Sequence, residues 1–421
     1  MALIVQKFGG SSLASAEHIR SVAKIVAQAR QKGHRVAVVV SAMGGETDRL
    51  LDLAGEITPA QPERELDALL ATGEQASAAL LAIALQNIDI PARSYLGLQL
   101  PLLTDGQHTR AHIIKLSTAE LKKTLEQEIV PVVAGFQGVS PGGDITTLGR
   151  GGSDTSAVAL AAALQAHCCE IHSDVDGVYT ADPAICPQAR HLRRISYGEM
   201  LEMADMGAKI LQIRSVELAR KFKVPLLIKS SFGSDKCTWI LEEDKRDMES
   251  AVISGIIISH NEAKMSVIRV PDRPGIAYQI LSPLAEAGIN VDMIIQNASI
   301  DGYTDFTFTV PKAELSTTTA LVNEVIPKIG ARALSTDDGI VKVSAVGLGI
   351  KNRPGVAARM FQVLADEGIN IQMISTSDIR LSCIIEAKYG ELAVRVLHDA
   401  FDLEINNNLN AIKQQKLDPP M

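Results

Sequence analysis

The sequence of 421 residues has few aromatic residues and no excess of positive charge. Phe, Trp and Tyr together make up 4% of the chain, and the formal net charge is -8. Few rings argue against a surface on which nucleic-acid bases stack, and a negative net charge disfavours a phosphate backbone as a partner. We therefore expect no nucleic-acid partner.

Signals for membranes and for secretion are also missing from the sequence. No uncharged apolar run approaches the ~20 residues that a spanning helix needs. The first residues lack the basic region and the small-residue cleavage site of a secretory signal peptide. The five cysteines are odd in number and form no CxxC pair, which favours structural thiols in a reducing compartment. The sequence predicts a cytoplasmic protein with no membrane partner.

The N-terminal part of the chain repeats a strand, loop and helix pattern. Residues 3–6 (LIVQ) and 35–40 (RVAVVV) are short apolar runs, and each leads into a loop of Gly and Ser. Apolar residues between positions 19 and 26 follow the helical period. The alternation recurs to about residue 240, so residues 1–241 predict one α/β domain. Its sheet should be largely parallel, with ligands at the carboxyl ends of the strands.

The C-terminal part contains an internal repeat. Residues 272–293 (DRPGIAYQILSPLAEAGINVDM) and 352–373 (NRPGVAARMFQVLADEGINIQM) align without gaps, with ten of twenty-two positions identical. Each copy predicts the order βαββαβ of a ferredoxin-like unit. The expected segments after the first domain are a charged linker at 242–262, ferredoxin-like domains at 263–339 and 340–404, and a polar tail at 405–421.

The first loop with chemical interest is KFGGSSL at residues 7–13. Its glycines let the backbone approach an anion closely, and Lys7 adds a positive charge at the end of a strand. The chain has no GxxxxGK[ST] motif, so this is not a Walker loop. The loop predicts a phosphate site, with an ordinary Gly-Ser turn as the alternative.

A second glycine-rich loop, TTLGRGGSDTS at residues 146–156, joins a strand to the start of a helix. The planar fork of Arg150 suits a carboxylate ligand, which it can bind with two hydrogen bonds. Asp154 can serve in the same site or act as a helix cap.

A third loop, SDVDGVYTADP at residues 173–183, follows a buried strand. Asp174 and Asp176 could hold a hydrated Mg²⁺ or contact a nucleotide, with an Asp-Gly turn as the alternative. Farther along, Lys209 lies at a predicted helix start, where a cation opposes the helix dipole unless an anion is bound. A solvated lysine is the alternative.

Together these motifs resemble the aspartate kinases of the amino-acid-kinase family, over nearly the whole chain. The paired repeats are similar to ACT domains. Members of that family transfer the γ-phosphoryl group of ATP to the side chain of L-aspartate, on the route to lysine, threonine and methionine. The resemblance implies an αβα sandwich with a largely parallel sheet, followed by two ferredoxin-like ACT domains. It rests on KFGGSS, VVVSAM, TGEQ, TTLGRGGSDT, SDVDGVYTADP and GAKILQIRSVE.

The resemblance also implies roles for individual residues. Arg150 would hold the α-carboxylate of aspartate and Glu74 its ammonium group. The residues that would be catalytic are Lys7, Glu74 and Asp154. Those that would bind aspartate are Ser41, Thr47, Glu74, Arg150, Gly151, Gly152 and Ser153. Those that would bind ATP are Lys7, Phe8, Gly9, Gly10, Ser11, Ser173, Asp174, Tyr179, Asp182 and Lys209. Mg²⁺ would accompany ATP, with no residue assigned as a certain ligand.

The implied reaction fits these residue types. An aspartate side chain, with a reference pKa of about 3.9, is already ionised at neutral pH and needs no general base. The obstacle is repulsion between a carboxylate and a triphosphate, so catalysis should depend on positioning and on cationic stabilisation. One departure concerns ATP, because Ala184 stands where the family commonly has arginine.

For the repeats, the resemblance implies pairing between ACT domains, a homodimer, and inhibition by threonine, lysine or both. The residues that would face effectors are Asp272, Gly275, Ala277, Gln296, Asn370 and Ile371. Turn chemistry alone is the alternative explanation of these residue types. Met248 could start a separate regulatory chain, or be a plain linker residue. Two other functions stay open, namely a related kinase with another acceptor and a non-catalytic amino-acid sensor.

Overall fold

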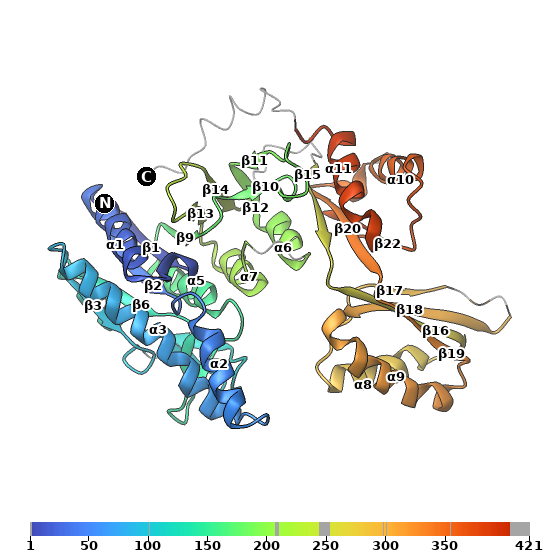
Figure 1. Ribbon diagram of the computed structural model, residues 1–421, viewed down its shortest axis with the longest axis horizontal. Coiled ribbons are helices and arrows are strands. Elements are labelled where there is room, and N and C mark those ends of the chain that lie inside the picture. Colours follow the sequence, from blue (N-terminus) through green and yellow to red (C-terminus); the bar gives the residue numbers. More distant parts are fainter. Residues whose placement is uncertain are drawn as a thin grey trace.

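The computed structural model describes residues 2–100, 102–206, 210–243, 253–297, 299, 301–353 and 355–404. An N-terminal α/β domain holds the first half of the chain, and two smaller sheets with their own helices form the second half (Figure 1). Lys209 and Met248, for which the sequence predicts roles, lie outside the described residues.

An eight-stranded sheet forms the centre of the N-terminal domain, in the order β12-β14-β13-β9-β1-β2-β6-β3. Every neighbouring pair is parallel except β13 with β14, so the predicted largely parallel sheet is confirmed. Its strands are β1 (Leu3–Phe8), β2 (Arg35–Val40), β3 (Ala92–Tyr95), β6 (Val130–Ala134), β9 (Cys168–Ser173), β12 (Arg194–Ser196), β13 (Leu226–Ser230) and β14 (Cys237–Leu241).

Helices cover both faces of this sheet, as the sandwich requires. Along β2, Val36, Val38 and Val40 face one core with α1 (Ala16–Gln31) and α3 (Glu63–Gln86). Ala37 and Val39 face the other core, with α5 (Gly152–Leu164) and α7 (Ile213–Phe222). Burial on both faces explains why these strands read as continuous apolar runs rather than as alternating patterns. The remaining helices of the domain are α2 (Glu46–Ile57), α4 (Ala119–Glu126) and α6 (Tyr197–Asp205), with the short 3-10 helix η1 (Ser11–Leu13).

Helix α3 is long and apolar enough to cross a membrane by length and composition, and half of its most apolar window is buried. It packs Ala78, Leu81 and Leu85 into the core beside α1. It also carries the buried carboxylates of Asp67 and Glu74. This is the packing of a core helix, which passes the same test as a spanning helix.

A small sheet stands beside the central one, in the order β5-β4-β7-β8. Its last strand leads directly into the second glycine-rich loop and α5, so it helps to place that loop. The strands are β4 (Leu102–Thr104), β5 (Ile113–Leu116), β7 (Gln137–Val139) and β8 (Ile145–Thr147). A further pair joins β10 (Val178–Tyr179) to β11 (His191–Leu192).

The first repeat folds as predicted, with all six elements in chain order and the sheet order β17-β18-β16-β19. Helices α8 (Ile276–Glu286) and α9 (Leu315–Ile329) pack on the sheet around Phe306 and Phe308. The strands are β16 (Glu262–Pro271), β17 (Ile294–Gln296), β18 (Tyr303–Pro311) and β19 (Ala333–Asp337).

The second repeat corrects the predicted linker at 242–262. Its sheet has the order β15-β20-β22-β21, and β15 (Ile253–Ser259) comes from within that predicted linker. The strand pairs with β20 and buries Ile253 and Ile256 in the core of the second repeat. The described residues of 340–404 supply three strands of this sheet, and β15 fills the edge beside β20 that they leave open. The first repeat is thus inserted between the edge strand of the second repeat and its remainder.

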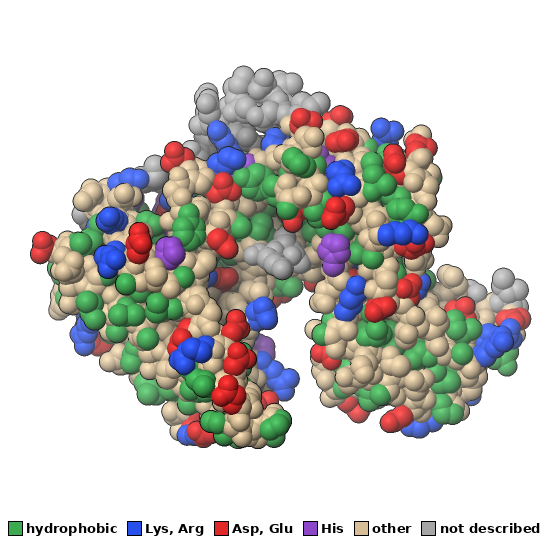
Figure 2. All heavy atoms as spheres, in the orientation of Figure 1, with side chains coloured by type: hydrophobic (Ala, Val, Ile, Leu, Met, Phe, Trp, Pro, Cys, Tyr) green, Lys and Arg blue, Asp and Glu red, His purple; other side chains and the backbone are tan. Residues whose placement is uncertain are grey.

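The other elements of the second repeat are β20 (Ile340–Gly347), α10 (Val356–Asp366), β21 (Met373–Thr376), β22 (Arg380–Glu386) and α11 (Gly390–Ala400). The two repeats occupy one side of the molecule, and a deep notch separates the first repeat from the N-terminal domain (Figure 2).

Candidate active site

The loops after β1, β2 and β9 meet at one edge of the central sheet. The backbone N–H of Ser41 donates to Phe8 O at 3.1 Å, and that of Gly9 donates to His172 O at 3.1 Å. A Cβ on Gly10 would lie 3.0 Å from Ala42 O, so a side chain at this position would force the first two loops apart. The Gly/Ser loops therefore meet at the carboxyl edge of the sheet, where the strand pattern predicts a ligand site.

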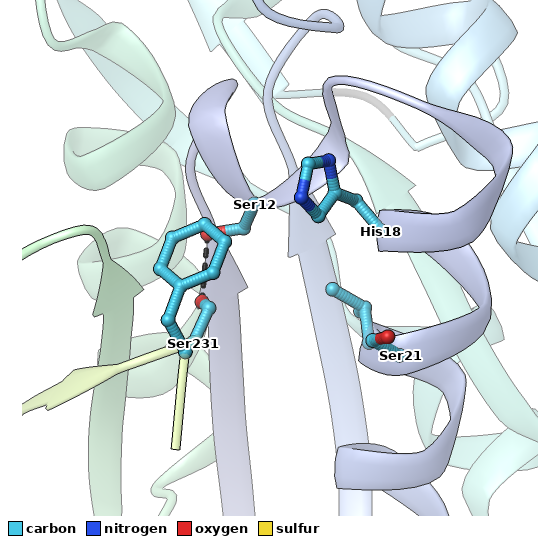
Figure 3. Close-up of a pocket in the computed structure, with 6 residues that line it drawn as sticks. Ser12, His18, Ser21 and Ser231 are labelled. Atoms are coloured by element: carbon cyan, nitrogen blue, oxygen red, sulfur yellow. Dashed lines mark hydrogen bonds between the residues drawn. The ribbon is translucent and has the colours of Figure 1, made fainter. Parts of the chain in front are cut away.

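The glycine-rich loop is also braced on its α1 side. The hydroxyl oxygens of Ser12 and Ser231 lie 2.7 Å apart, which joins the loop to the end of β13 (Figure 3). A cavity of about 290 Å³ opens there, lined by Ser12, His18, Ser21, Val22, Ser231 and Phe232. The predicted catalytic residues do not line this cavity. Its lining supports the loop from the face opposite to that of Lys7.

Lys7 and Asp154 form a buried ion pair, with Nζ 2.6 Å from Oδ1 and about a tenth of each side chain exposed (10% and 11%). Lys7 comes from β1, and Asp154 from the first turn of α5 after the left-handed Gly151 (φ 69°). The first and second glycine-rich loops therefore contribute to one centre. An ion pair at this depth needs close geometry to repay its lost hydration, so the two groups orient each other.

The predicted contact of Phe8 with ATP cannot be made by its side chain. Successive residues of a strand point to opposite faces, so Phe8 faces away from Lys7. Its ring is fully buried and stacks on His172 at 4.7 Å between centroids. Its side chain supports the loop from the core and cannot contact ATP.

Glu74 approaches the same centre from α3. Its Oε1 accepts the N–H of Ala42 at 2.9 Å, while Oε2 is buried and has no hydrogen-bond partner among the described residues. A Cβ on Gly73 would lie 2.8 Å from the Cβ of Ala42, so the preceding glycine permits this close approach. Burial raises the pKa of Glu74 to about 7, against the lowering effects of the Ala42 N–H and of the charge on Lys7. A buried carboxylate with one free oxygen suits a cationic ligand.

Four side chains predicted to bind the acceptor leave their polar groups available. Ser41, Thr47, Arg150 and Ser153 make no side-chain hydrogen bond or ion pair with other residues that the structure describes, and Arg150 is exposed. Ser153 lies against Gly135, where a Cβ would come within 3.0 Å of its Oγ. Gly151 leaves no room for a side chain, because Gln212 lies against it. Gly152 begins α5 beside them.

The predicted nucleotide residues follow β9, next to the glycine-rich loop. Ser173 ends β9, and its carbonyl accepts the N–H of Ser231 at 2.9 Å. Asp174 is exposed. Tyr179 donates to Asp176 Oδ1 at 2.9 Å and accepts from Lys236 at 3.2 Å.

Asp182 is exposed, and its Oδ1 accepts the N–H of Ala184 at 2.8 Å in a local turn. That bond fixes the turn, so the predicted contact of Asp182 with ATP stays a prediction.

A buried carboxylate under the glycine-rich loop was not predicted. Glu170 accepts from Gln6 and Lys229, both at 2.8 Å, and lies 3.2 Å from His172 Nε2. Burial raises its pKa, but His172 and Lys229 more than offset this, so the pKa of Glu170 lies well below its ordinary value. The alternation of β1 could have indicated the group, because Gln6 and Glu170 share the face opposite to Lys7.

Family models match three segments of the chain. The model of the amino acid kinase family matches residues 2–230, and ACT domain models match residues 266–326 and 343–401. The chain is 52% identical to an aspartate kinase of Pseudomonas putida over 404 residues, which is 96% of this chain and 98% of that protein. The chain belongs to the aspartate kinase family.

Other aspartate kinases agree in sequence and in fold. An aspartokinase of Corynebacterium glutamicum is 46% identical over 407 residues, covering 96% of this chain and 97% of that protein. The R-state structure of E. coli aspartokinase III with aspartate and ADP has a TM-score of 0.78 at 25% identity, covering 94% of this chain and 99% of that one. Its T-state structure with lysine and aspartate has a TM-score of 0.74 at 25% identity, covering 95% and 99%.

The predicted effector residues fall in two different ACT domains. Gly275 is the N-cap residue of α8 at φ 89°, and Asp272 Oδ2 accepts the N–H of Ser299 at 3.2 Å. Gln296 ends β17 nearby in the chain, and Ala277 lies on α8. These four belong to the first ACT domain. Asn370 and Ile371 lie between α10 and β21 of the second ACT domain.

Proposed function

We propose that the chain transfers the γ-phosphoryl group of ATP to the side-chain carboxylate of L-aspartate, giving ADP and 4-phospho-L-aspartate. The observation that carries the proposal is one buried centre that holds a lysine, its carboxylate partner and a second carboxylate with a free oxygen. In such a centre the lysine can attract the two anionic reactants, and the free carboxylate oxygen can attract the ammonium group of aspartate. The product would feed the synthesis of lysine, threonine and methionine.

Two charged groups would hold the acceptor. Arg150 can bind the α-carboxylate with two hydrogen bonds, since its guanidinium has no partner in the described chain. Glu74 would bind the ammonium group through Oε2. Ser41, Thr47 and Ser153 would then present hydroxyls to the reacting carboxylate. The acceptor is already an anion, so no residue has to remove a proton.

The donor would lie on the glycine-rich loop. Backbone N–H groups of Gly9, Gly10 and Ser11 would face the phosphates, and Lys7 would neutralise charge on the transferring group. Asp154 holds Nζ of Lys7 at 2.6 Å and so keeps it directed at the centre. Ser173 and Tyr179 would line the nucleotide side.

Mg²⁺ would arrive with ATP, and it supplies further positive charge to the phosphates when bound. The described residues contain no cluster of three or more metal-ligating side chains. This fits an ion held mainly by phosphate and water with one or two carboxylates. Asp174, exposed at the end of β9, is the carboxylate suited to that role, since Asp176 is already bonded to Tyr179 and Ser234.

The ACT domains would make the enzyme responsive to its end products. Lysine, threonine or both would bind at the ACT domains and favour an arrangement with lower activity, which requires different affinities for two states. The lysine-bound T-state of E. coli aspartokinase III supports this assignment. ACT edges would also pair two chains into a homodimer in the cytoplasm. A chain starting at Met248 would contain β15 and hence both complete sheets.

The test is a coupled ADP-release assay with L-aspartate, with L-glutamate and without acceptor, each with and without lysine and threonine. We expect turnover with aspartate as acceptor and none with glutamate or without acceptor. Lysine, threonine or both should lower that turnover. Glutamate-dependent turnover would indicate a related kinase with another acceptor. No turnover with any acceptor would favour an amino-acid sensor, although such a protein would be expected to have lost Lys7, Arg150 or Asp154.

A further inference from the structure

Helix α3 carries a second buried carboxylate, Asp67, two turns before Glu74. Its side chain is fully buried at 0% exposure. It accepts from Thr147 Oγ1 at 2.5 Å and from the Thr109 N–H at 3.0 and 3.1 Å, and it lies 2.7 Å from His108 Nδ1. Every one of these partners comes from outside α3. A buried carboxylate with this many donors fixes the groups that surround it.

The partners of Asp67 flank the turn that carries Arg150. Thr147 ends β8, three residues before Arg150. Thr109 lies in the loop between β4 and β5, and its carbonyl would be 3.1 Å from a Cβ at Gly149. The N–H of Ala111 in the same loop donates to Thr147 O at 2.9 Å. Asp67 therefore ties both neighbours of the Arg150 turn to α3.

The backbone conformation of Thr109 independently indicates that Asp67 holds the loop between β4 and β5 in place. Thr109 has φ 63°, a left-handed conformation that β-branched residues rarely adopt. Such a conformation persists only where the surroundings determine it. The N–H of this residue donates to both oxygens of Asp67.

We propose that Asp67 is a positioning residue for the acceptor, an inference that rests on the proposed function. Asp67 holds the Arg150 turn at a fixed place relative to Glu74, because Glu74 lies seven residues after Asp67 on α3. These two side chains are the proposed ligands of the α-carboxylate and the ammonium group, so their spacing determines how well aspartate binds. Lys7 and the phosphate loop lie outside this network.

The experiment compares four variants by steady-state kinetics and thermal unfolding. Asp67→Asn keeps the shape but loses acceptor capacity, and Thr147→Val removes one hydroxyl. Thr147→Ser restores that hydroxyl. Asp105→Asn is the matched control, because Asp105 accepts the N–H of Gln107 and of His112, both at 3.1 Å, in the same loop but at the surface.

We expect the KM for aspartate to rise about tenfold or more in Asp67→Asn and about threefold in Thr147→Val, because small misplacements of binding groups weaken productive binding. Thr147→Ser and Asp105→Asn should stay within about twofold of the wild type, and the KM for ATP should stay within about twofold throughout. A merely structural role would lower the melting temperature without separating the two KM values.

An unchanged KM for aspartate in Thr147→Val and Asp67→Asn, or an equal rise of both KM values, would overturn the proposal. If Asp67→Asn does not fold, the KM for aspartate of Thr147→Val, compared with that of Thr147→Ser, decides whether the proposal holds. A wild-type protein without aspartate-dependent ADP release would instead refute the proposed function itself.

Discussion

Two buried lysines in this molecule have different surroundings, one in the kinase domain and one between the ACT domains. Lys7 has one carboxylate partner, Asp154, at 2.6 Å, and Glu74 beside it keeps one oxygen without a partner. Lys342, on β20, is 2% exposed and pairs with both Glu262, at 2.9 Å, and Asp292. Burial lowers the pKa of Lys342, but these two carboxylates more than offset it and raise the pKa.

The difference separates a binding centre from a structural junction. The charges around Lys342 satisfy one another, so the cluster holds the two ACT domains together without a ligand. The centre at Lys7 retains a carboxylate oxygen with no partner, which burial penalises until a cation arrives. Arg380 extends the ACT cluster to the kinase domain, with Glu202 and Asp205 of α6 both at 3.1 Å.

The largest effect should follow from Lys342→Met. Removing the lysine leaves Glu262 and Asp292 without their shared cation at the junction. We expect the free energy of unfolding to fall by about 3 to 5 kcal/mol, with turnover per folded molecule unchanged. Calorimetry of the full chain measures the first quantity and the ADP assay the second.

The control for that variant is Lys388→Met in the second ACT domain. Lys388 pairs with Glu386 at 2.7 Å and both side chains are exposed, so the loss of stability should be small beside that of Lys342→Met. Equal losses in the two variants would remove the contrast between a buried and an exposed cluster.

Lys7→Ala should lower turnover, and it should also lower stability because it leaves buried Asp154 without its partner. Losing one group that stabilises the transferring charge should lower kcat by roughly 100-fold or more. The exposed Lys24 on α1 provides the control as Lys24→Ala, with no change expected in kcat. Near-normal turnover by Lys7→Ala would show that this lysine is structural, like Lys342.

Glu74→Gln should make the protein more stable while it weakens aspartate binding. The pKa of Glu74 in the folded protein, about 7, lies above its ordinary value of 4.5. The folded state therefore binds more protons between these values, and stability falls as pH rises through that window. Relative to the wild type, the substitution should add about 2 kcal/mol above pH 7, after the cost of burying the amide is subtracted. Below about pH 4.5 only that cost remains, so stability should fall by about 1 kcal/mol.

Thermal unfolding of Glu74→Gln and wild type over a pH series checks this prediction. A stability difference that does not change with pH would mean that Glu74 does not titrate in this window. Glu170→Gln is the useful comparison, because the lowered pKa of Glu170 predicts the opposite sign, a loss of stability at neutral pH.

The smallest effect concerns Ala184. This exposed residue follows the Asp182-Pro183 turn, where the family commonly has arginine. Ala184→Arg adds an exposed cation near the proposed nucleotide side and should lower the KM for ATP about two- to fivefold without changing kcat. Ala184→Gln, with similar length and no charge, should leave the KM for ATP unchanged. Equal effects of both substitutions would argue against an electrostatic cause.

Much of the fold could be predicted because short-range sequence patterns indicate most of its elements. The apolar runs of β1 and β2, the helical period of α1 and the repeated segments of the ACT domains each have a short-range signal. The strand β15 has such a signal too, but its partner β20 lies over 80 residues away along the chain. No local pattern tells which open edge a strand will fill, so the sequence predicts a linker in this segment.

The candidate site shows the same limit at the level of single residues. The motifs placed Lys7, Arg150 and Asp154 in loops that the structure brings to one edge of the sheet. The motif predicts a contact of Phe8 with ATP, although strand alternation turns the side chain of Phe8 away from Lys7. The sequence does not single out Asp67, since a lone carboxylate in a helical sequence does not reveal that its partners lie 41 and 80 residues away.

The central proposal is that Glu74 binds the ammonium group of aspartate. The number of protons released when aspartate binds tests this proposal most directly. Near pH 7 Glu74 should be about half protonated, and only its ionised form should bind the ligand, so binding should release about half a proton per aspartate. Titration calorimetry in two buffers of different ionisation enthalpy measures this number. The release should vanish near pH 9, where Glu74 is already ionised. No release near pH 7, or the same release at both pH values, would contradict this account.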